Sequence, residues 1–293
     1  MKSFLIGALL LFTSFIPAAE FNAKHQKKIP EANKPAQLVR TTVRHEQRRL
    51  PYGGTLTLVG APVGSITIEA WPNSEVDITA EVQLRADTEQ DLDRLAIVNN
   101  VVVDDEPNHV RIFTTGTHDK SFMKRLKKFP KTLLGLPWKV DYRIRVPVLM
   151  DLDISAGSGP ININGIEGNI QLSAAESETN LRLSGGTLNA TIAIGKVNLI
   201  VPVKSWRRGG VDIRVAAGEV TVELPPGFAG DLDADILRSG QIVNAYDGLE
   251  VREKPGITPR IVKARAGAGG TPFRFTVGDG TINIRKQAAD SKQ

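Results

Sequence analysis

The chain has 293 residues, a formal net charge of +5 at pH 7 and no cysteine. This length allows one large domain or two small ones. The absence of cysteine excludes a disulfide scaffold, a thiolate metal site, a cysteine nucleophile and a lipoprotein anchor. Aromatic residues make up only 5% of the chain, so the core must be mainly aliphatic.

The first residues have the pattern of a secretory signal. Met1-Lys2 precedes an apolar run from Phe4 to Ile16, and Pro17-Ala18-Ala19 follows it. The run is short of the roughly 20 residues that cross a bilayer. We therefore predict a signal peptide over 1–19, with an uncleaved N-terminal anchor as the alternative. The exported chain is expected in the periplasm or at the cell surface, with no transmembrane segment after cleavage.

Positive charge is concentrated in two segments. Residues 20–52 contain eight Lys and Arg against three Asp and Glu, and residues 120–140 contain seven against none. The rest of the exported chain has more acids than bases. The pattern predicts a basic polar leader over 20–49 and a basic insertion over 116–139 on an acidic body. Because we expect export, we do not expect a nucleic-acid partner.

The first part of the body alternates apolar and polar residues, as half-buried strands do. Strands are predicted over 55–58, 65–69, 75–82 and, as a hairpin, 101–104 and 110–114. A helix is predicted over 88–99, because Thr88 can cap it and Leu92, Leu95 and Ala96 fall on one face.

From Val140 onward, short strand-like pieces recur, often at intervals of eight or nine residues. Glycine precedes many of them, at 159, 168, 186, 195, 210, 218, 230 and 280. The predicted strands are 142–146, 152–154, 161–163, 170–172, 181–183, 188–194, 197–199, 211–215, 220–224, 232–236 and 281–284. This spacing suits a sandwich, a barrel or a solenoid. We favour an all-β solenoid, a single-stranded β-helix-like stack with one or two short helices. Ile161 and Ile163 would face inward, and Asn162 and Asn164 outward.

Three stretches carry a family resemblance: Gly64 to Trp71, Tyr142 to Gly168 and Gly278 to Ile284. They resemble the DUF4097 family, a group of bacterial envelope proteins for which a role as adhesins has been proposed. The resemblance covers about 50–286 and leaves a polar tail over 287–293. It implies an all-β repeat fold and an envelope location, but no catalytic residues. The basic insertion and the scarcity of Gly-Asp pairs depart from the family pattern.

A search for catalytic chemistry finds no HExxH, GxSxG or Walker motif, and we expect no cofactor. Asp231, Asp233 and Asp235 alternate along a strand and share one face, where carboxylates could hold Ca²⁺. We favour a solvated strand face instead. A second candidate is a glycan site at Lys204, Trp206, Arg207 and Arg208. The alternative there is a loop with Trp206 tucked against the body.

The basic insertion carries the strongest functional signal. A helix over 121–129 would separate an apolar side from a cationic side, and an aromatic residue follows. The candidate binding residues are Phe122, Met123, Lys124, Arg125, Leu126, Lys127, Lys128, Phe129 and Trp138. Basic amphipathic helices bind membrane surfaces or partner proteins. The other interpretation is a lid on the open end of the β stack. The sequence leaves both open.

Two classes of function follow. The first is a non-catalytic envelope protein, adhesin-like or a scaffold, that binds an anionic membrane surface, a glycan or an envelope protein. The second is a β-helix carbohydrate-active enzyme, a lyase or glycoside hydrolase. A membrane-sensing or envelope-stress module is a further alternative. We favour the first class, because the repeat faces carry few aromatics and only isolated charges. The oligomeric state is left open.

Overall fold

The computed structural model describes residues 37–288, apart from 127, 204–205 and 207–208. This part of the chain is all-β and forms one mixed 16-stranded sheet with two short α-helices and one 3-10 helix. The helices are α1 (Glu89–Val98), α2 (Lys120–Arg125) and the 3-10 helix η1 (Lys131–Leu133). The strands are β1 (Leu38–Arg49), β2 (Thr55–Val59), β3 (Ile66–Trp71), β4 (Glu75–Ala86), β5 (Asn100–Glu106), β6 (His109–Thr115), β7 (Trp138–Pro147), β8 (Asp151–Ser158), β9 (Ile161–Asn164), β10 (Glu167–Arg182), β11 (Gly185–Ile200), β12 (Val211–Leu224), β13 (Gly230–Ala245), β14 (Leu249–Val251), β15 (Ile261–Ala266) and β16 (Pro272–Lys286).

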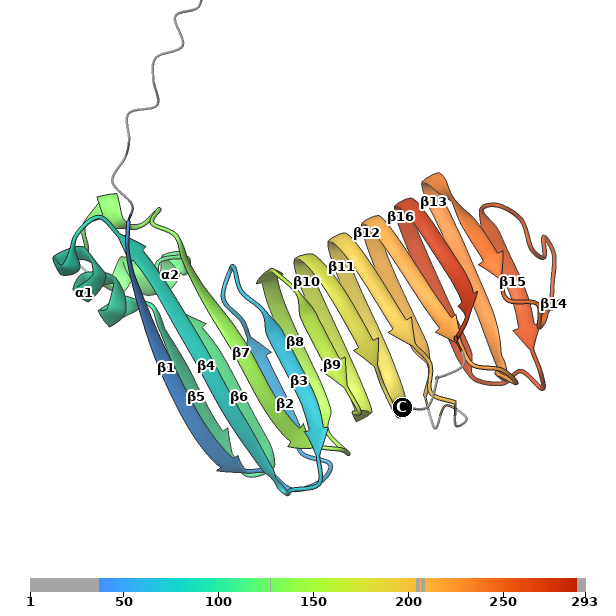
Figure 1. Ribbon diagram of the computed structural model, residues 1–293, viewed down its shortest axis with the longest axis horizontal. Helices are drawn as coiled ribbons and strands as arrows, with labels where there is room; N and C mark the ends of the chain where they lie inside the picture. The colour runs from blue at the N-terminus through green and yellow to red at the C-terminus, as the bar shows by residue number, and fades with distance from the viewer. Residues whose placement is uncertain (1–36, 127, 204–205, 207–208, 289–293) are drawn as a thin grey trace, which may run out of the picture. The chain divides into compact units, whose positions relative to one another are not determined.

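Long parallel strands form the second half of the sheet. β10, β11, β12, β16 and β13 lie side by side in this order (Figure 1). Each has an N-terminal and a C-terminal leg. β10, for example, pairs with β8 through its N-terminal leg and with β9 through its C-terminal leg. The predicted pieces 170–172 and 181–183 are thus two legs of one strand. Alternate side chains of both legs, such as Leu172 and Leu181, are buried in one hydrophobic core.

Glycine lets these strands turn from one leg to the other. Gly195, Gly218, Gly280 and Gly240 occupy equivalent positions in neighbouring strands. Gly218 has φ +146°, and a Cβ there would overlap the carbonyl oxygen of Gly195. Such backbone angles are open almost only to glycine. The strands stay hydrogen-bonded to their neighbours on both sides of each glycine. Gly195, Gly218 and Gly280, which precede predicted short pieces, therefore lie inside long strands and do not end them.

The predicted solenoid is not confirmed, because the sheet does not close and its strand order departs from chain order. β16 is last in sequence but lies between β12 and β13. β13 also pairs with β15 in antiparallel fashion, and β15 pairs with β14. Neither β14 nor β15 was predicted. A solenoid adds each strand beside its predecessor, whereas here the chain leaves a gap beside β12 that its last strand fills.

The predicted leader over 20–49 needs a correction, because its last part is a strand. β1 pairs antiparallel with β4 over its full length, from Leu38 opposite Ala86 to Arg49 opposite Glu75. No side chain of β1 is buried. A strand that contributes hydrogen bonds but no core residue lacks the alternation of apolar residues that a sequence search detects. Residues 1–36, including the predicted signal peptide, lie outside the described residues.

The predicted helix and hairpin are confirmed. Thr88 caps α1 by accepting a hydrogen bond from the backbone N–H of Asp91, at 3.1 Å. Leu92 and Leu95 are buried. The hairpin of β5 and β6 turns at Asn108, whose φ is +61°. Ile161 and Ile163 face the core, whereas Asn162 and Asn164 lie on the outer face, as predicted.

The hydroxyl of Tyr142 on β7 is buried in the core, and its ionisation should make the free energy of unfolding depend on pH. The hydroxyl donates to Thr114 Oγ1 at 2.5 Å, since Thr114 in turn donates to the carbonyl of Val59. Burial raises the pKa of Tyr142 to about 12. The neutral phenol therefore stabilises the fold fully below pH ~10, and we expect a loss of ~2 kcal/mol as the pH rises towards 12.

The variant Tyr142→Phe should lose ~1 kcal/mol at neutral pH but show a flatter decline above pH 10. Urea unfolding at a series of pH values measures both effects. Tyr52→Phe, at a half-exposed tyrosine, is the control and should keep the wild-type decline. An identical alkaline decline in wild type and Tyr142→Phe would contradict this assignment.

Candidate functional site

The basic insertion contains a helix shorter than predicted. α2 ends at Arg125, and Leu126 is its C-cap, rather than continuing to 129. Asp119 caps the N-terminus by accepting from the backbone N–H groups of Ser121 and Phe122, at 2.8 and 2.9 Å. The hydrogen bond from Phe122 is the main cause of the lowered pKa of Asp119. A longer helix would also place Lys124 and Lys128 four positions apart, a like-charge pair that destabilises a helix by a few tenths of a kcal/mol.

Much of the apolar surface of the insertion covers the core. Leu133 is buried, and Phe129, Leu136 and Trp138 pack against the core. Trp138 is the first residue of β7, and its ring lies 5.3 Å from that of His118. Phe122, Met123 and Leu126 are half-buried. These contacts fit the lid interpretation for the second part of the insertion.

The cations of residues 120–131, here called the cationic segment, face solvent. The exposed members are Lys120, Lys124, Arg125, Lys128 and Lys131. Within the described part of the chain, none of them has a carboxylate partner within 4 Å. Lys139, by contrast, pairs with Asp141 at 2.6 Å. The side chain of Lys127 lies outside the described residues. The segment therefore presents uncompensated positive charge.

An apolar groove of about 590 Å³ lies between α1 and the cationic segment. Its apolar lining is formed by Ile97, Val98, Leu126, Phe129 and Pro130, and its cations are Arg94, Arg125 and Lys128. Ile97 is 79% exposed, the largest value among the exposed hydrophobic side chains of the described residues. The sequence search missed Ile97, although its position off the buried face of α1 was a readable signal. The groove combines apolar surface with a cationic rim.

The basic residues of the predicted leader behave differently. On β1, Arg40 pairs with Glu89 and Asp93 of α1, both at 2.7 Å. Arg44 and Arg48 pair with Glu46. These cations are matched by nearby acids, so the expected contrast between a basic leader and an acidic body does not hold for β1. The cationic segment differs from Arg40, Arg44 and Arg48 because it brings five exposed cations without a carboxylate partner in the described chain close together in sequence.

The carboxylate row on β13 is neutralised by cations of neighbouring strands. Asp233 pairs with Arg252 at 2.7 Å, and Asp231 with Arg265 at 3.1 Å. Lys263 lies 3.7 Å from both Asp233 and Asp235. Partial burial is the largest single effect and opposes ionisation of Asp231, but the hydrogen bonds from Arg265 and Gly270, together with the charges of Arg265 and Arg252, outweigh it, so the pKa of Asp231 is lowered. Within the described residues, no group of His, Cys, Asp and Glu could hold a metal ion.

Trp206, the aromatic residue of the candidate glycan site, packs against the body of the protein. Trp206 is buried, donates to the carbonyl of Gly186 at 2.9 Å and contacts Phe273 edge-on at 5.5 Å. It is therefore tucked against the body, as the alternative interpretation had it. Lys204, Arg207 and Arg208 lie outside the described residues.

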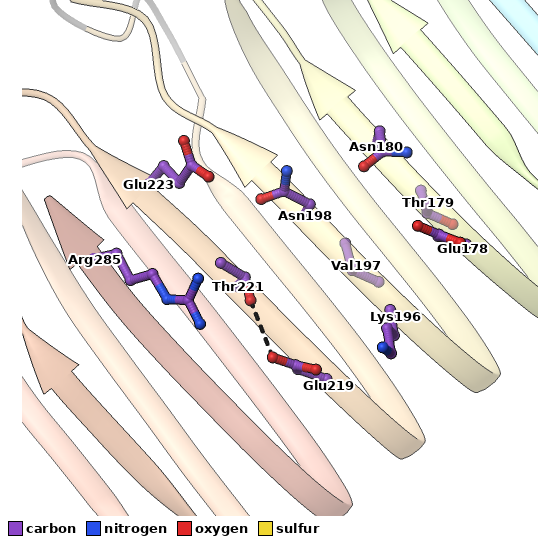
Figure 2. Close-up of a pocket in the computed structure, with 10 residues that line it drawn as sticks. All are labelled: Glu178, Thr179, Asn180, Lys196, Val197, Asn198, Glu219, Thr221, Glu223 and Arg285. Atoms are coloured by element: carbon purple, nitrogen blue, oxygen red, sulfur yellow. Dashed lines mark hydrogen bonds between the residues drawn. The ribbon is translucent and has the colours of Figure 1, made fainter. Parts of the chain in front are cut away.

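A polar groove that the sequence search did not single out lies on the outer face of the C-terminal legs. Figure 2 shows its lining, which comes from β10, β11, β12 and β16. The volume is about 230 Å³. The lining residues are Glu178, Thr179, Asn180, Lys196, Val197, Asn198, Glu219, Thr221, Glu223 and Arg285. Thr179 and Val197 belong to the core face; the other residues lie on the outer face, where they alternate with core residues along each strand, and only the strand register brings them together.

No helix in the described ranges has the length and hydropathy needed to cross a bilayer. No protein-family model matches the chain, so the DUF4097 resemblance is not confirmed. No curated protein sequence matches it either.

Three solved structures are similar at low sequence identity. A "putative cell adhesion protein" from Clostridium sporogenes matches with a TM-score of 0.44 and 15% identity, over 84% of this chain and 100% of that one. A "putative adhesin" from Bacteroides fragilis matches at 0.40 and 12%, over 83% and 97%. A "putative lipid binding protein" from Parabacteroides distasonis matches at 0.29 and 14%, over 83% and 96%. Similarity at these TM-scores does not extend to function.

Proposed function

We propose that this chain is a non-catalytic protein of the bacterial cell envelope that attaches to an anionic membrane surface through the cationic segment. The observation that carries the proposal is the unmatched charge of Lys120, Lys124, Arg125, Lys128 and Lys131 beside the apolar groove. Each Lys or Arg near an anionic lipid surface contributes about 1 kcal/mol. The signal-like N-terminus and the DUF4097 resemblance support an exported, adhesin-like protein.

The lid and the membrane-binding interpretations assign different residues of the insertion. Leu133, Leu136 and Trp138 cover the core and hold the insertion in place. Capping of the core needs apolar contacts, but it does not need a row of exposed cations. Membrane binding uses those cations together with the exposed side chain of Ile97 and the half-buried side chain of Leu126. Both roles are therefore compatible in one segment.

The enzyme alternative has weaker support. Asp231 and Asp233, two of the three candidate carboxylates, are each paired with an arginine. A general acid needs a raised pKa, and that of Asp231 is lowered. Turnover of an envelope polysaccharide that is lost on substitution of these aspartates would restore the enzyme alternative.

The apolar part of the proposal is tested with Ile97→Ser combined with Leu126→Ser. The chain from Glu20 onward keeps the whole described unit and avoids the apolar run at 4–16. We expect about tenfold weaker co-sedimentation with phosphatidylglycerol-containing vesicles, because partial burial of two such side chains contributes at least ~1.4 kcal/mol. The melting temperature should fall by only a small amount, since Ile97 contacts mainly solvent and Leu126 is only half-buried.

Leu237→Ser combined with Val203→Ser is the matched control, because both side chains are well exposed elsewhere. This control should bind vesicles as the wild type does. A lower melting temperature of the Ile97 and Leu126 variant with unchanged vesicle binding would assign these residues to the lid alone.

A further inference from the structure

A row of amide and hydroxyl side chains crosses the C-terminal legs of five neighbouring strands. The row consists of Asn162, Asn180, Asn198, Thr221 and Asn283, each paired in register with the next. Because the strands are parallel and in register, the five side chains lie on the same outer face. With a spacing of ~4.8 Å between strands, the row spans ~19 Å.

Charged side chains flank this row on both sides. Glu178, Lys196 and Glu219 follow one side, and Glu223 and Arg285 follow the other (Figure 2). In the described ranges, none of these five forms an ion pair within 4 Å. Their charges remain available to a ligand.

The hydrogen-bonding capacity of the groove is only partly used. Asn180 donates to Asn162 at 3.1 Å, and Glu219 accepts from Thr221 at 3.4 Å and from Asn283. The Oδ1 atom of Asn198 is buried and has no hydrogen-bond partner within the described chain. A buried acceptor without a donor costs free energy, which rotation of the Asn198 side chain towards a donor in the groove would recover. The groove thus favours a ligand rich in hydrogen-bond donors.

The residues that line the groove restrict the classes of ligand that it can bind. Three carboxylates against two cations disfavour a polyanion. Thr179 and Val197 point into the core, so the groove has no exposed apolar or aromatic floor for a hydrophobic ligand. No metal-binding group occurs among the described residues. Sugar hydroxyls both donate and accept, and the strand spacing is close to the length of one sugar unit in an extended glycan.

From this geometry we propose that the polar row binds a glycan chain of neutral or amino sugars. The chain lies across β10, β11, β12 and β16, with successive sugar units over successive strands. Asn198 turns its side-chain amide towards the groove and accepts a hydrogen bond from a sugar hydroxyl, and Glu178 and Glu223 accept from hydroxyl or ammonium groups at the flanks. This site is independent of the cationic segment, and soluble sugars test it without lipid.

The test is isothermal titration calorimetry with cellohexaose, a glucosamine hexamer and a galacturonic acid hexamer. The first two should bind, and the acidic hexamer should not. Cellohexaose should bind at least about tenfold more tightly than cellobiose, because it reaches along the whole row. Asn198→Ala combined with Thr221→Ala should weaken cellohexaose binding about tenfold, or ~1.4 kcal/mol.

Two further double variants test the flanking carboxylates and provide a control away from the row. Glu178→Gln combined with Glu223→Gln should weaken the glucosamine hexamer more than cellohexaose, because an ammonium group loses more than a hydroxyl when a carboxylate becomes an amide. Ser173→Ala combined with Thr191→Ala alters exposed residues on the other legs of β10 and β11 and should change nothing.

Failure of the wild type to bind both the neutral and the amino-sugar hexamer at millimolar concentration would overturn the proposal. Binding that the row variant leaves unchanged, or binding equally tight for cellobiose and cellohexaose, would overturn it as well.

Discussion

Replacement of Gly218 by alanine should lower the free energy of unfolding by about 4 kcal/mol, among the largest effects of a single substitution. Gly218 adopts φ +146°, where an L side chain is strained. Its Cβ would also overlap the backbone oxygen of Gly195, which the neighbouring strand holds in the parallel ladder. Because both strands pair on their other sides too, neither can shift without loss of hydrogen bonds. Urea unfolding of wild type and variant measures the difference, with an unchanged m-value as the sign that the denatured state is the same.

Alanine substitutions at two other glycines separate the cost of backbone strain from the cost of steric overlap. Gly53 has φ +79° but open space around it, so Gly53→Ala should cost only the backbone strain, about 1 kcal/mol. Gly135 has open space and no positive φ, so Gly135→Ala should be neutral or slightly stabilising. A Gly218→Ala protein within about 1 kcal/mol of wild type would show that the corner glycines do not hold the legs together.

Local features of the fold could be predicted from the sequence because they depend on nearby residues. The alternation of Ile161 and Ile163 with Asn162 and Asn164 is enough to assign inward and outward faces. Thr88 and the apolar spacing after it are enough to place α1. The order of the strands in the sheet could not be predicted in this way, because it depends on which strands pair with each other.

The elements that escaped prediction are those set by pairing partners. β1 lacks buried side chains, so only its hydrogen bonds to β4 identify it as a strand. The position of β16 between β12 and β13 leaves no trace in local periodicity. The polar row has the same origin, because Asn198 and Thr221 become neighbours only through the register of β11 and β12.

The candidate binding site was partly predictable. The excess of lysine and arginine over 120–139 is visible in the sequence, and within the described residues most of these cations have no carboxylate partner within 4 Å. The shorter helix and the burial of Leu133 follow from contacts with the core. Ile97 joins the site only because α1 lies beside the cationic segment, a contact between distant parts of the sequence.

Removal of three cations from the cationic segment should abolish most membrane attachment. The variant combines Lys124→Gln, Arg125→Gln and Lys128→Gln, all at exposed positions without carboxylate partners in the described chain. At about 1 kcal/mol per cation, the loss is ~3 kcal/mol, or ~100-fold in affinity for anionic vesicles. The melting temperature should stay at the wild-type value, because these side chains do not contact the core.

The matched control removes the same amount of charge elsewhere, by Arg49→Gln, Lys254→Gln and Lys286→Gln. If net charge alone attracted the protein to the surface, this control would lose as much affinity as the first variant. We expect it to retain most of the wild-type binding, because attraction to a surface depends on cations that approach it together.

The most direct test of the proposed function is vesicle binding of the wild-type chain from Glu20 onward, at low and high salt. Vesicles that contain phosphatidylglycerol are compared with vesicles of phosphatidylcholine alone. We expect binding to the anionic vesicles at about 0.1 M salt, where the Debye length is ~10 Å, and a steep loss towards 1 M, where it is ~3 Å. Neutral vesicles should bind weakly at both salt concentrations. Binding that ignores both lipid charge and salt, or no binding to anionic vesicles at low salt, would contradict the proposed function.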